Sequence, residues 1–183
     1  MKHFYYIRHG ESEDNINNIW GGHRDTKLTP KGLEQAATAA EQVRKEGLRF
    51  DLIISSPLTR ARLTAKAIAE ATGYPVNKIV YDDRFLERDL GELEGTKQSD
   101  TMQSWDDYKI LDSFDSVEKL EHLQARMAEA LDYIKSRPED NVLVVAHAAI
   151  GRGIRRILAG KDFTTEYTEP FNQIPNATLI KFI

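Results

Sequence analysis

The 183-residue sequence contains no cysteine. This absence excludes disulfides, thiolate metal sites and the phosphatase and protease mechanisms that use a cysteine nucleophile. There is also no apolar run of about 18 residues, the length that a membrane-spanning helix needs. The N-terminus lacks the basic-then-apolar layout of a secretory signal, because Arg8 and His9 interrupt its one apolar segment. We therefore expect a cytoplasmic protein with no membrane partner.

The sequence also lacks a large net charge of either sign. The formal net charge is −4, which gives no general reason to expect a nucleic acid as partner. The acids are unevenly placed, since residues 82–121 carry 13 acidic and 5 basic side chains. A composition with 40% hydrophobic and 30% charged residues is typical of a globular protein, and we predict a single domain over residues 1–183.

Apolar runs alternate with helical patterns along the chain. Strand composition is found at residues 2–7, 51–56 and 141–147, and more weakly at 78–81 and 177–183. Helices are predicted to begin at Thr29-Pro30, at Ser56-Pro57, at the capping-box pattern of residues 115–118 and after His147, and to end at Gly47, at Gly73, before Pro138 and at Gly160. Such alternation predicts an α/β layered fold with a mostly parallel sheet.

Three of the predicted strands end in polar residues. The first ends at Arg8-His9, the second leads into a helix whose start carries Arg60, and the third ends at His147. In a parallel sheet, ligands bind beyond the carboxyl ends of the strands, so we expect these side chains to converge. Two arginines beside two helix N-termini suit a phosphate dianion better than a carboxylate or a sugar.

A histidine in such a pocket is a candidate nucleophile. Neighbouring positive charge disfavours the imidazolium form, and a neutral imidazole can attack phosphorus where no cysteine is available. A leaving alkoxide needs a proton, and a bound phosphate dianion raises the pKa of the nearest carboxyl group, which makes it a competent acid. The residues alone leave four candidates for this acid, namely Glu87, Asp89, Glu92 and Glu94.

Ordered motifs over most of the chain resemble the histidine phosphatase superfamily, which includes cofactor-dependent phosphoglycerate mutases and many small phosphatases. The motifs are Arg8-His9-Gly10-Glu11-Ser12 with Asn15, the segment from Gly22 through Asp25, Leu28-Thr29 and Gly32 to Gln35-Ala36, Ser55-Ser56-Pro57-Leu58 with Arg60-Ala61 and Thr64-Ala65, Leu86-Glu87 with Gly91 and Glu94-Gly95, and Val145-Ala146-His147. The resemblance implies a three-layer α/β/α sandwich of the phosphoglycerate mutase-like kind, and it implies that no metal is needed. We also expect no cofactor.

The resemblance also implies roles for individual residues. His9 would form a phosphohistidine, and Glu87 would donate the proton to the leaving group. The residues implied to bind the transferring phosphoryl group are Arg8, Arg60 and His147, and those implied to help bind phosphate or substrate are Asn15, Gly21 and Gly22. The partner is then a small phosphorylated substrate.

One position departs from the family's pattern. The family usually has glycine directly after the second histidine, whereas Ala148 and Ala149 follow His147 here. Ala148 keeps its backbone N–H and is included among the substrate-binding residues, although its methyl group restricts the approach of a bulky ligand. A metal cluster of His3, His9, His23 and His147 is not expected, because no metal-ligand spacing is present.

Three functions fit these residues. The first is a phosphomonoesterase, the second is a mutase that returns the phosphoryl group to a sugar-acid phosphate, and the third is a non-catalytic phospholigand-binding module. The acidic stretch 82–121 lies where family mutases carry further basic residues, which favours a phosphatase. A nucleophile together with an acid speaks against binding alone. Arg152, Arg155 and Arg156 are interpreted as a solvated helix face, and the glycosylation pattern at Asn176 carries no weight without a signal peptide.

Overall fold

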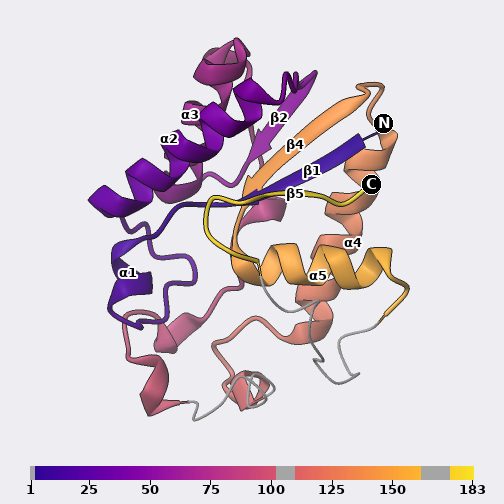
Figure 1. The fold of residues 1–183 in the computed structure, drawn as a ribbon. Coiled ribbons are helices and arrows are strands. Elements are labelled where there is room, and N and C mark those ends of the chain that lie inside the picture. Colours follow the sequence, from indigo (N-terminus) through magenta and orange to yellow (C-terminus); the bar gives the residue numbers. More distant parts are fainter. Residues whose placement is uncertain (1–2, 102–109, 162–173) are drawn as a thin grey trace.

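The computed structural model describes residues 3–101, 110–161 and 174–183. Five strands and five α-helices make up the regular part of these ranges (Figure 1). In chain order they are β1 (His3–Arg8), α1 (Glu13–Ile16), α2 (Pro30–Lys45), β2 (Leu52–Ser55), α3 (Thr59–Thr72), β3 (Val80–Tyr81), α4 (Leu120–Ser136), β4 (Asn141–Ala146), α5 (Ala148–Leu158) and β5 (Leu179–Lys181).

The strands form one sheet in the order β3-β2-β4-β1-β5. All neighbours are parallel except β1 and β5, which are antiparallel. The register of β1 on β4 runs from His3 opposite Asn141 to Arg8 opposite Ala146, so both strands end at the same edge. This arrangement confirms the predicted mostly parallel sheet.

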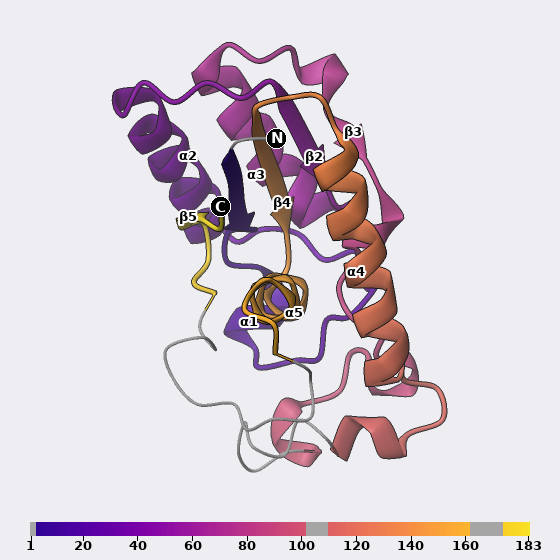
Figure 2. The same cartoon turned by 90° about the vertical axis from the view of Figure 1, so that its right-hand side faces the viewer.

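Helices cover both faces of the sheet. Side chains alternate along a strand, so Tyr5 and Ile7 of β1 pack against α2 and α3, while Phe4 and Tyr6 pack against α4 and α5. Figure 2 shows α2 and α4 on opposite sides of the strands. The three-layer α/β/α architecture is therefore confirmed. Among the described residues, no helix has the length and apolar character needed to cross a membrane.

Several helix ends agree with the sequence. Thr29 caps α2 by accepting the Gly32 N–H at 2.9 Å, and Pro30 occupies the first helical position. Gly47 and Gly73 adopt left-handed φ values of 69° and 72° just after α2 and α3, a conformation that glycine reaches without steric cost.

Two helix starts and one helix face differ from the predictions. Helix α3 begins at Thr59 with Leu58 as its N-cap, because the Ser56 hydroxyl accepts only the Leu58 N–H, at 3.4 Å, and lies 2.8 Å from His147 Nε2. Helix α4 begins at Leu120 rather than at residues 115–118, since the Glu118 carboxylate is bound by Arg126 and does not cap a helix. The predicted solvated face of α5 is also wrong in part, because Arg156 is only 2% exposed.

The segment between β3 and α4 has little regular structure, as predicted for residues 95–113. Its described part contains the 3₁₀ helices Asp83–Phe85, Gly91–Leu93 and Gln98–Asp100. These turns pack Leu90, Leu93 and Leu111 around Trp20 in a small apolar cluster of their own. Residues 102–109 lie outside the described ranges.

Candidate active site

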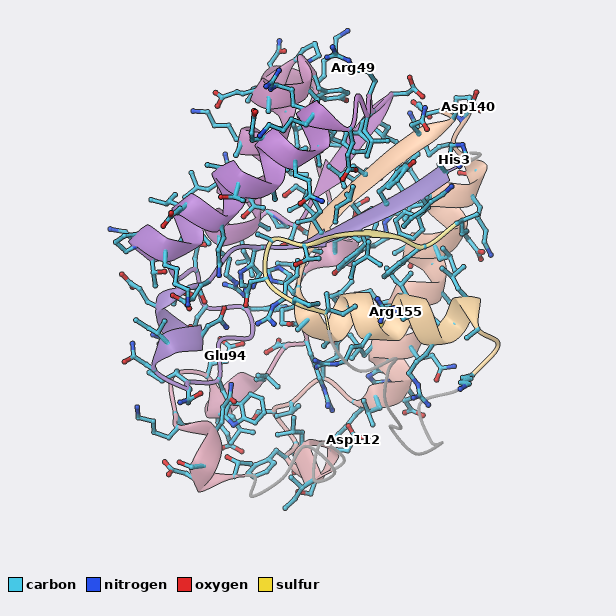
Figure 3. All side chains as sticks on the ribbon, in the orientation of Figure 1. His3, Arg49, Glu94, Asp112, Asp140 and Arg155 are labelled. Atoms are coloured by element: carbon cyan, nitrogen blue, oxygen red, sulfur yellow. The ribbon has the colours of Figure 1, made fainter. Side chains whose placement is uncertain are left out.

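The carboxyl ends of β1, β2 and β4 bring the predicted histidines together. The His9 N–H donates to the Ala146 carbonyl at 2.9 Å, which continues the ladder one residue beyond β1. His147 directly follows β4, and its ring centroid lies 5.1 Å from that of His9. Figure 3 labels His3 and Asp140 at the opposite end of these strands, with Glu94 and Asp112 beyond the carboxyl ends.

The His9 ring is fixed in one tautomer. Its Nδ1 lies 2.6 Å from the Gly10 carbonyl oxygen, which can only accept, so Nδ1 carries the proton and Nε2 keeps its lone pair. The Gly10 peptide is itself held, because its N–H donates to the Thr64 hydroxyl at 3.1 Å. A Cβ at Gly10 would lie 2.3 Å from the Gly32 carbonyl oxygen, so only glycine allows this close approach.

Both histidines are held neutral near pH 7. The pKa of His9 lies well below 6.5, chiefly because burial penalises the imidazolium and further because Arg60 and Arg8 are close. Burial and the same two arginines lower the pKa of His147 in the same way. The sequence predicted this neutrality from the cations alone, whereas burial is the larger cause.

Two buried donors point to an anion at this edge. Within the described ranges, the Arg8 Nε and the His147 Nδ1 have no hydrogen-bond partner although both atoms are buried. His147 Nε2 lies 2.8 Å from the Ser56 hydroxyl, which can donate to it and leave the proton on Nδ1. Burial lowers the pKa of Arg8 to about 10, so its guanidinium stays charged at neutral pH. A phosphoryl group can accept from both donors.

Arg60 is buried and holds a loop as well as facing the site. Its Nη2 donates to the Gly22 carbonyl at 2.8 Å and its Nη1 to the Arg24 carbonyl at 2.5 Å. The N-terminus of α3 is taken by Asp25, whose carboxylate accepts the Thr59 N–H at 2.6 Å. The expectation that this helix N-terminus would bind the phosphate is therefore corrected.

The Glu87 carboxylate lies over the start of α5. Its Oε2 accepts the Ala149 N–H at 3.3 Å, and its Oε1 accepts the Arg88 N–H at 3.0 Å. The charge of Glu87 partly offsets the burial that lowers the pKa values of Arg8 and Arg60, which places the three side chains in one electrostatic environment.

The other three acid candidates serve the loop or face solvent. Glu94 Oε1 accepts the N–H groups of His23 and Leu90 at 2.7 and 3.3 Å. Asp89 Oδ1 accepts the Gly91 N–H at 2.9 Å, and Glu92 is exposed. The geometry therefore favours Glu87 as the acid, a choice that residue chemistry alone left open.

Arg126 is a site residue that the sequence did not reveal. Its Nη1 donates to the carbonyls of Arg84 and Leu86 at 2.9 and 2.8 Å, and its Nη2 donates to the Glu87 carbonyl at 3.3 Å. Glu118 holds the other edge of the guanidinium at 2.7 and 2.9 Å. The contact crosses from α4 to the loop, so no local motif could have predicted it.

Asn15 and Asn176 support the strand end. Asn15 Oδ1 accepts the Ser12 N–H at 3.1 Å, which fixes the orientation of its amide and leaves its NH₂ group to donate elsewhere. Asn176 donates to the His9 carbonyl at 2.8 Å and to Asn15 Oδ1 at 3.3 Å. The sequence indicated only a glycosylation pattern at Asn176 and missed this contact.

Gly21 and Gly22 belong to the loop that Arg60 holds, and Gly22 is required there for steric reasons. Gly22 has a φ of 47°, and a Cβ there would lie 2.2 Å from the Glu94 carboxylate. The Gly21 carbonyl accepts the Arg24 N–H at 2.9 Å. Substrate contacts of Gly21, Gly22 and Ala148 stay predictions.

Three acids of the stretch 82–121 are paired with arginines of the protein itself. Asp82 pairs with Arg84, Asp112 pairs with the fully buried Arg88, and Glu118 pairs with Arg126. The charge balance of residues 82–121 is therefore not a direct measure of the charge that faces the site. In the part of the chain that the structure describes, no three histidine or acidic residues are grouped to hold a metal ion.

Curated relatives include mutases and a phosphatase. The 2,3-bisphosphoglycerate-dependent phosphoglycerate mutase of Bartonella bacilliformis is 40% identical over 99 residues, 54% of this chain and 48% of that protein. The chain thus spans about half the length of the curated mutase that it matches. The protein named "Putative phosphoserine phosphatase 2" of Hydrogenobacter thermophilus is 32% identical over 167 residues, 87% of this chain and 80% of that protein.

Solved structures share the fold. Phosphoglycerate mutase of Bacillus anthracis has a TM-score of 0.83 at 22% identity, over 98% of this chain and 86% of that chain. Phosphoserine phosphatase of Entamoeba histolytica has a TM-score of 0.77 at 25% identity, over 99% and 90%. The sequence profile of the histidine phosphatase superfamily (branch 1) matches residues 4–182. The chain therefore belongs to the histidine phosphatase superfamily, as its motifs predicted.

Proposed function

We propose that the protein is a phosphomonoesterase that hydrolyses a small phosphorylated metabolite through a phosphohistidine on His9. The observation that carries this proposal is the state of the His9 ring. A neutral imidazole with its proton held on Nδ1 presents the Nε2 lone pair beside two buried donors that lack partners in the described ranges. A nucleophile and groups that stabilise the phosphoryl charge are then present at one place.

The reaction proceeds in two steps. In the first, the Nε2 lone pair attacks phosphorus, the bond between phosphorus and the ester oxygen breaks, and the leaving oxygen takes the proton of the Glu87 carboxylic acid. In the second, the Glu87 carboxylate removes a proton from water and the water oxygen attacks phosphorus. The bond from phosphorus to Nε2 breaks, its electron pair returns to the ring, and inorganic phosphate leaves.

Arg8, Arg60 and His147 position the phosphoryl group and neutralise its charge in both steps. The His9 proton stays on Nδ1 throughout, because the Gly10 carbonyl accepts it. Buried guanidinium groups that need no reorganisation supply the main electrostatic contribution in reactions of this kind.

A mutase is the second candidate, because the mutase relatives reach 40% identity. Their aligned segment covers only about half of this chain, whereas the Hydrogenobacter relative aligns over 87% of it. A mutase also needs cationic groups for a second anionic arm of its substrate. The acidic stretch supplies few of these, and its arginines Arg84 and Arg88 are paired with acids.

Two assays on one preparation separate the candidates. The phosphatase predicts release of inorganic phosphate from a panel of phosphorylated metabolites and from an aryl phosphate, all of it lost in His9→Ala. The mutase predicts interconversion of 2- and 3-phosphoglycerate with little phosphate release. A protein that does neither, yet binds phosphate, would be a phospholigand-binding module.

A further inference from the structure

We propose that Tyr6 is a positioning residue for His147, and that its hydroxyl sets the backbone of the second histidine for phosphoryl binding. The Tyr6 hydroxyl accepts the His147 N–H at 3.0 Å and donates to the His147 carbonyl oxygen at 2.6 Å. One buried hydroxyl thus holds both peptide groups of a single site residue. The expected effect on kcat rests on the proposed function, whereas the hydrogen bonds between Tyr6 and His147 do not depend on it.

The position of Tyr6 in the sheet makes this contact possible. Tyr6 lies two residues before Arg8 on β1, so its side chain is on the same face of the strand as Arg8 and is fully buried between β1, α4 and α5. Its ring stacks on Phe182, with centroids 5.2 Å apart and planes 1° from parallel. The far end of the ring reaches under the first turn of α5.

A glycine on α5 makes room for the ring. A Cβ at Gly151 would lie 2.6 Å from Tyr6 Cε1, so the helix approaches the ring only because this side chain is absent. The hydroxyl then meets His147 at the N-cap of α5, where the His147 carbonyl also accepts the Gly151 N–H at 3.1 Å. The packing of β1 against α5 therefore determines where the hydroxyl lies.

The consequence for the site follows from the other contacts of His147. Its ring is held at Nε2 by Ser56, and its Nδ1 is buried without a partner in the described ranges. Because Tyr6 holds the His147 backbone and Ser56 holds its ring, the N–H bond at His147 Nδ1 is fixed in one orientation. A preorganised donor stabilises the phosphoryl group in the transition state without reorganisation. Tyr6 stays protonated in this role, because burial raises its pKa well above 10.

The test uses five variants, of which one is His147→Ala, and a ligand that needs no turnover. Tyr6→Phe keeps the ring and removes only the hydroxyl. Tyr5→Phe is the matched control, because Tyr5 packs on Phe50 at the opposite face of the sheet. Both substitutions are also made in a His147→Ala background. Affinity for orthovanadate, a phosphoryl transition-state mimic, is measured by calorimetry at a temperature where each variant is folded.

Tyr6→Phe should weaken orthovanadate binding about tenfold and lower kcat for an aryl phosphate by a similar factor, with little change in KM. Tyr5→Phe should match the wild type. In the His147→Ala background, Tyr6→Phe should have no further effect, because its action passes through His147. Wild-type affinity in Tyr6→Phe, or the full loss persisting without His147, would overturn the inference.

The test also separates a failure of the proposed hydrolase from a failure of the Tyr6 inference. If the wild type binds orthovanadate but releases no phosphate from any substrate, the proposed hydrolase is rejected, and the vanadate comparison still decides the role of Tyr6. If Tyr6→Phe does not fold, NMR of the wild type replaces it. The inference then requires a slowly exchanging Tyr6 hydroxyl proton with a nuclear Overhauser effect to the His147 amide proton, and its absence counts against the contact.

Discussion

His9 donates its Nδ1 proton to the carbonyl oxygen of Gly10 across 2.6 Å. This contact decides which ring nitrogen can react, because a carbonyl accepts and never donates. It also explains why glycine follows the histidine. The Gly10 backbone passes so close to Gly32 that a Cβ would lie 2.3 Å from the Gly32 carbonyl oxygen. The packing of α2 against the strand end therefore fixes the nucleophile.

The proton donor can be tested by varying the leaving group. Glu87→Gln removes the acid, so kcat/KM for an alkyl phosphate should fall by about 10²–10⁴. An aryl phosphate whose leaving group needs no proton should lose much less in kcat/KM. It should also show a burst of the released phenol, because the second step has lost its base. Equal losses for both substrates would assign Glu87 a different role.

Arg126 should act through the Glu87 segment. Arg126→Met removes the donors to the carbonyls of Arg84, Leu86 and Glu87, so kcat/KM for an alkyl phosphate should fall about tenfold and that for an aryl phosphate less. Arg126→Lys should recover only part of this loss, because an ammonium cannot reproduce the planar fork.

Arg62→Met is the matched control, since Arg62 lies over the Tyr81 ring with its Cζ 4.6 Å from the ring centroid. Kinetics of the Arg126 variants with both substrates check the prediction. An Arg126→Met enzyme that loses the same factor on both would show a general loss of structure rather than a misplaced acid.

The two buried histidines should make stability depend on pH. The pKa values of His9 and His147 lie well below 6.5 in the folded protein, so below about pH 6.5 only the unfolded chain takes up these protons. The free energy of unfolding should therefore fall as the pH drops, by up to about 1.4 kcal/mol per pH unit for each histidine. Urea unfolding between about pH 5.5 and 7.5 measures this slope.

His147→Asn should reduce the slope of the free energy of unfolding against pH by roughly half, even if the substitution changes the stability at every pH. His122→Asn is the control, because the His122 side chain is 71% exposed. A slope that His147→Asn leaves unchanged would mean that other groups cause the pH dependence.

The sequence predicted the central strands well. Residues 51–56 and 141–147 contain apolar runs rich in β-branched residues, and the structure places β2 and β4 within them. The start of α4 was wrong, because the acid of the apparent capping box binds Arg126 instead. The pattern of residues 115–118 is local, whereas the contact that overrides it joins two elements.

In the candidate site, too, the residues placed by local patterns were predicted, and those placed by contacts between elements were not. Arg8, His9, Arg60 and His147 were predictable because strand ends in a parallel sheet meet at one edge. The roles of Tyr6 and Asn176 were not, since each depends on which residues pack against it. Burial was likewise underestimated as the cause of histidine neutrality, because a sequence shows nearby charges more readily than desolvation.

Trapping of the covalent intermediate tests the central claim most directly. The enzyme is mixed with an aryl phosphate, quenched within milliseconds in alkali, digested and examined by mass spectrometry, with Glu87→Gln used to slow the second step. The mechanism predicts one phosphoryl group on His9 that is lost in mild acid and is absent from His9→Ala. A phosphoryl group on any other residue, or turnover that persists in His9→Ala, would contradict it.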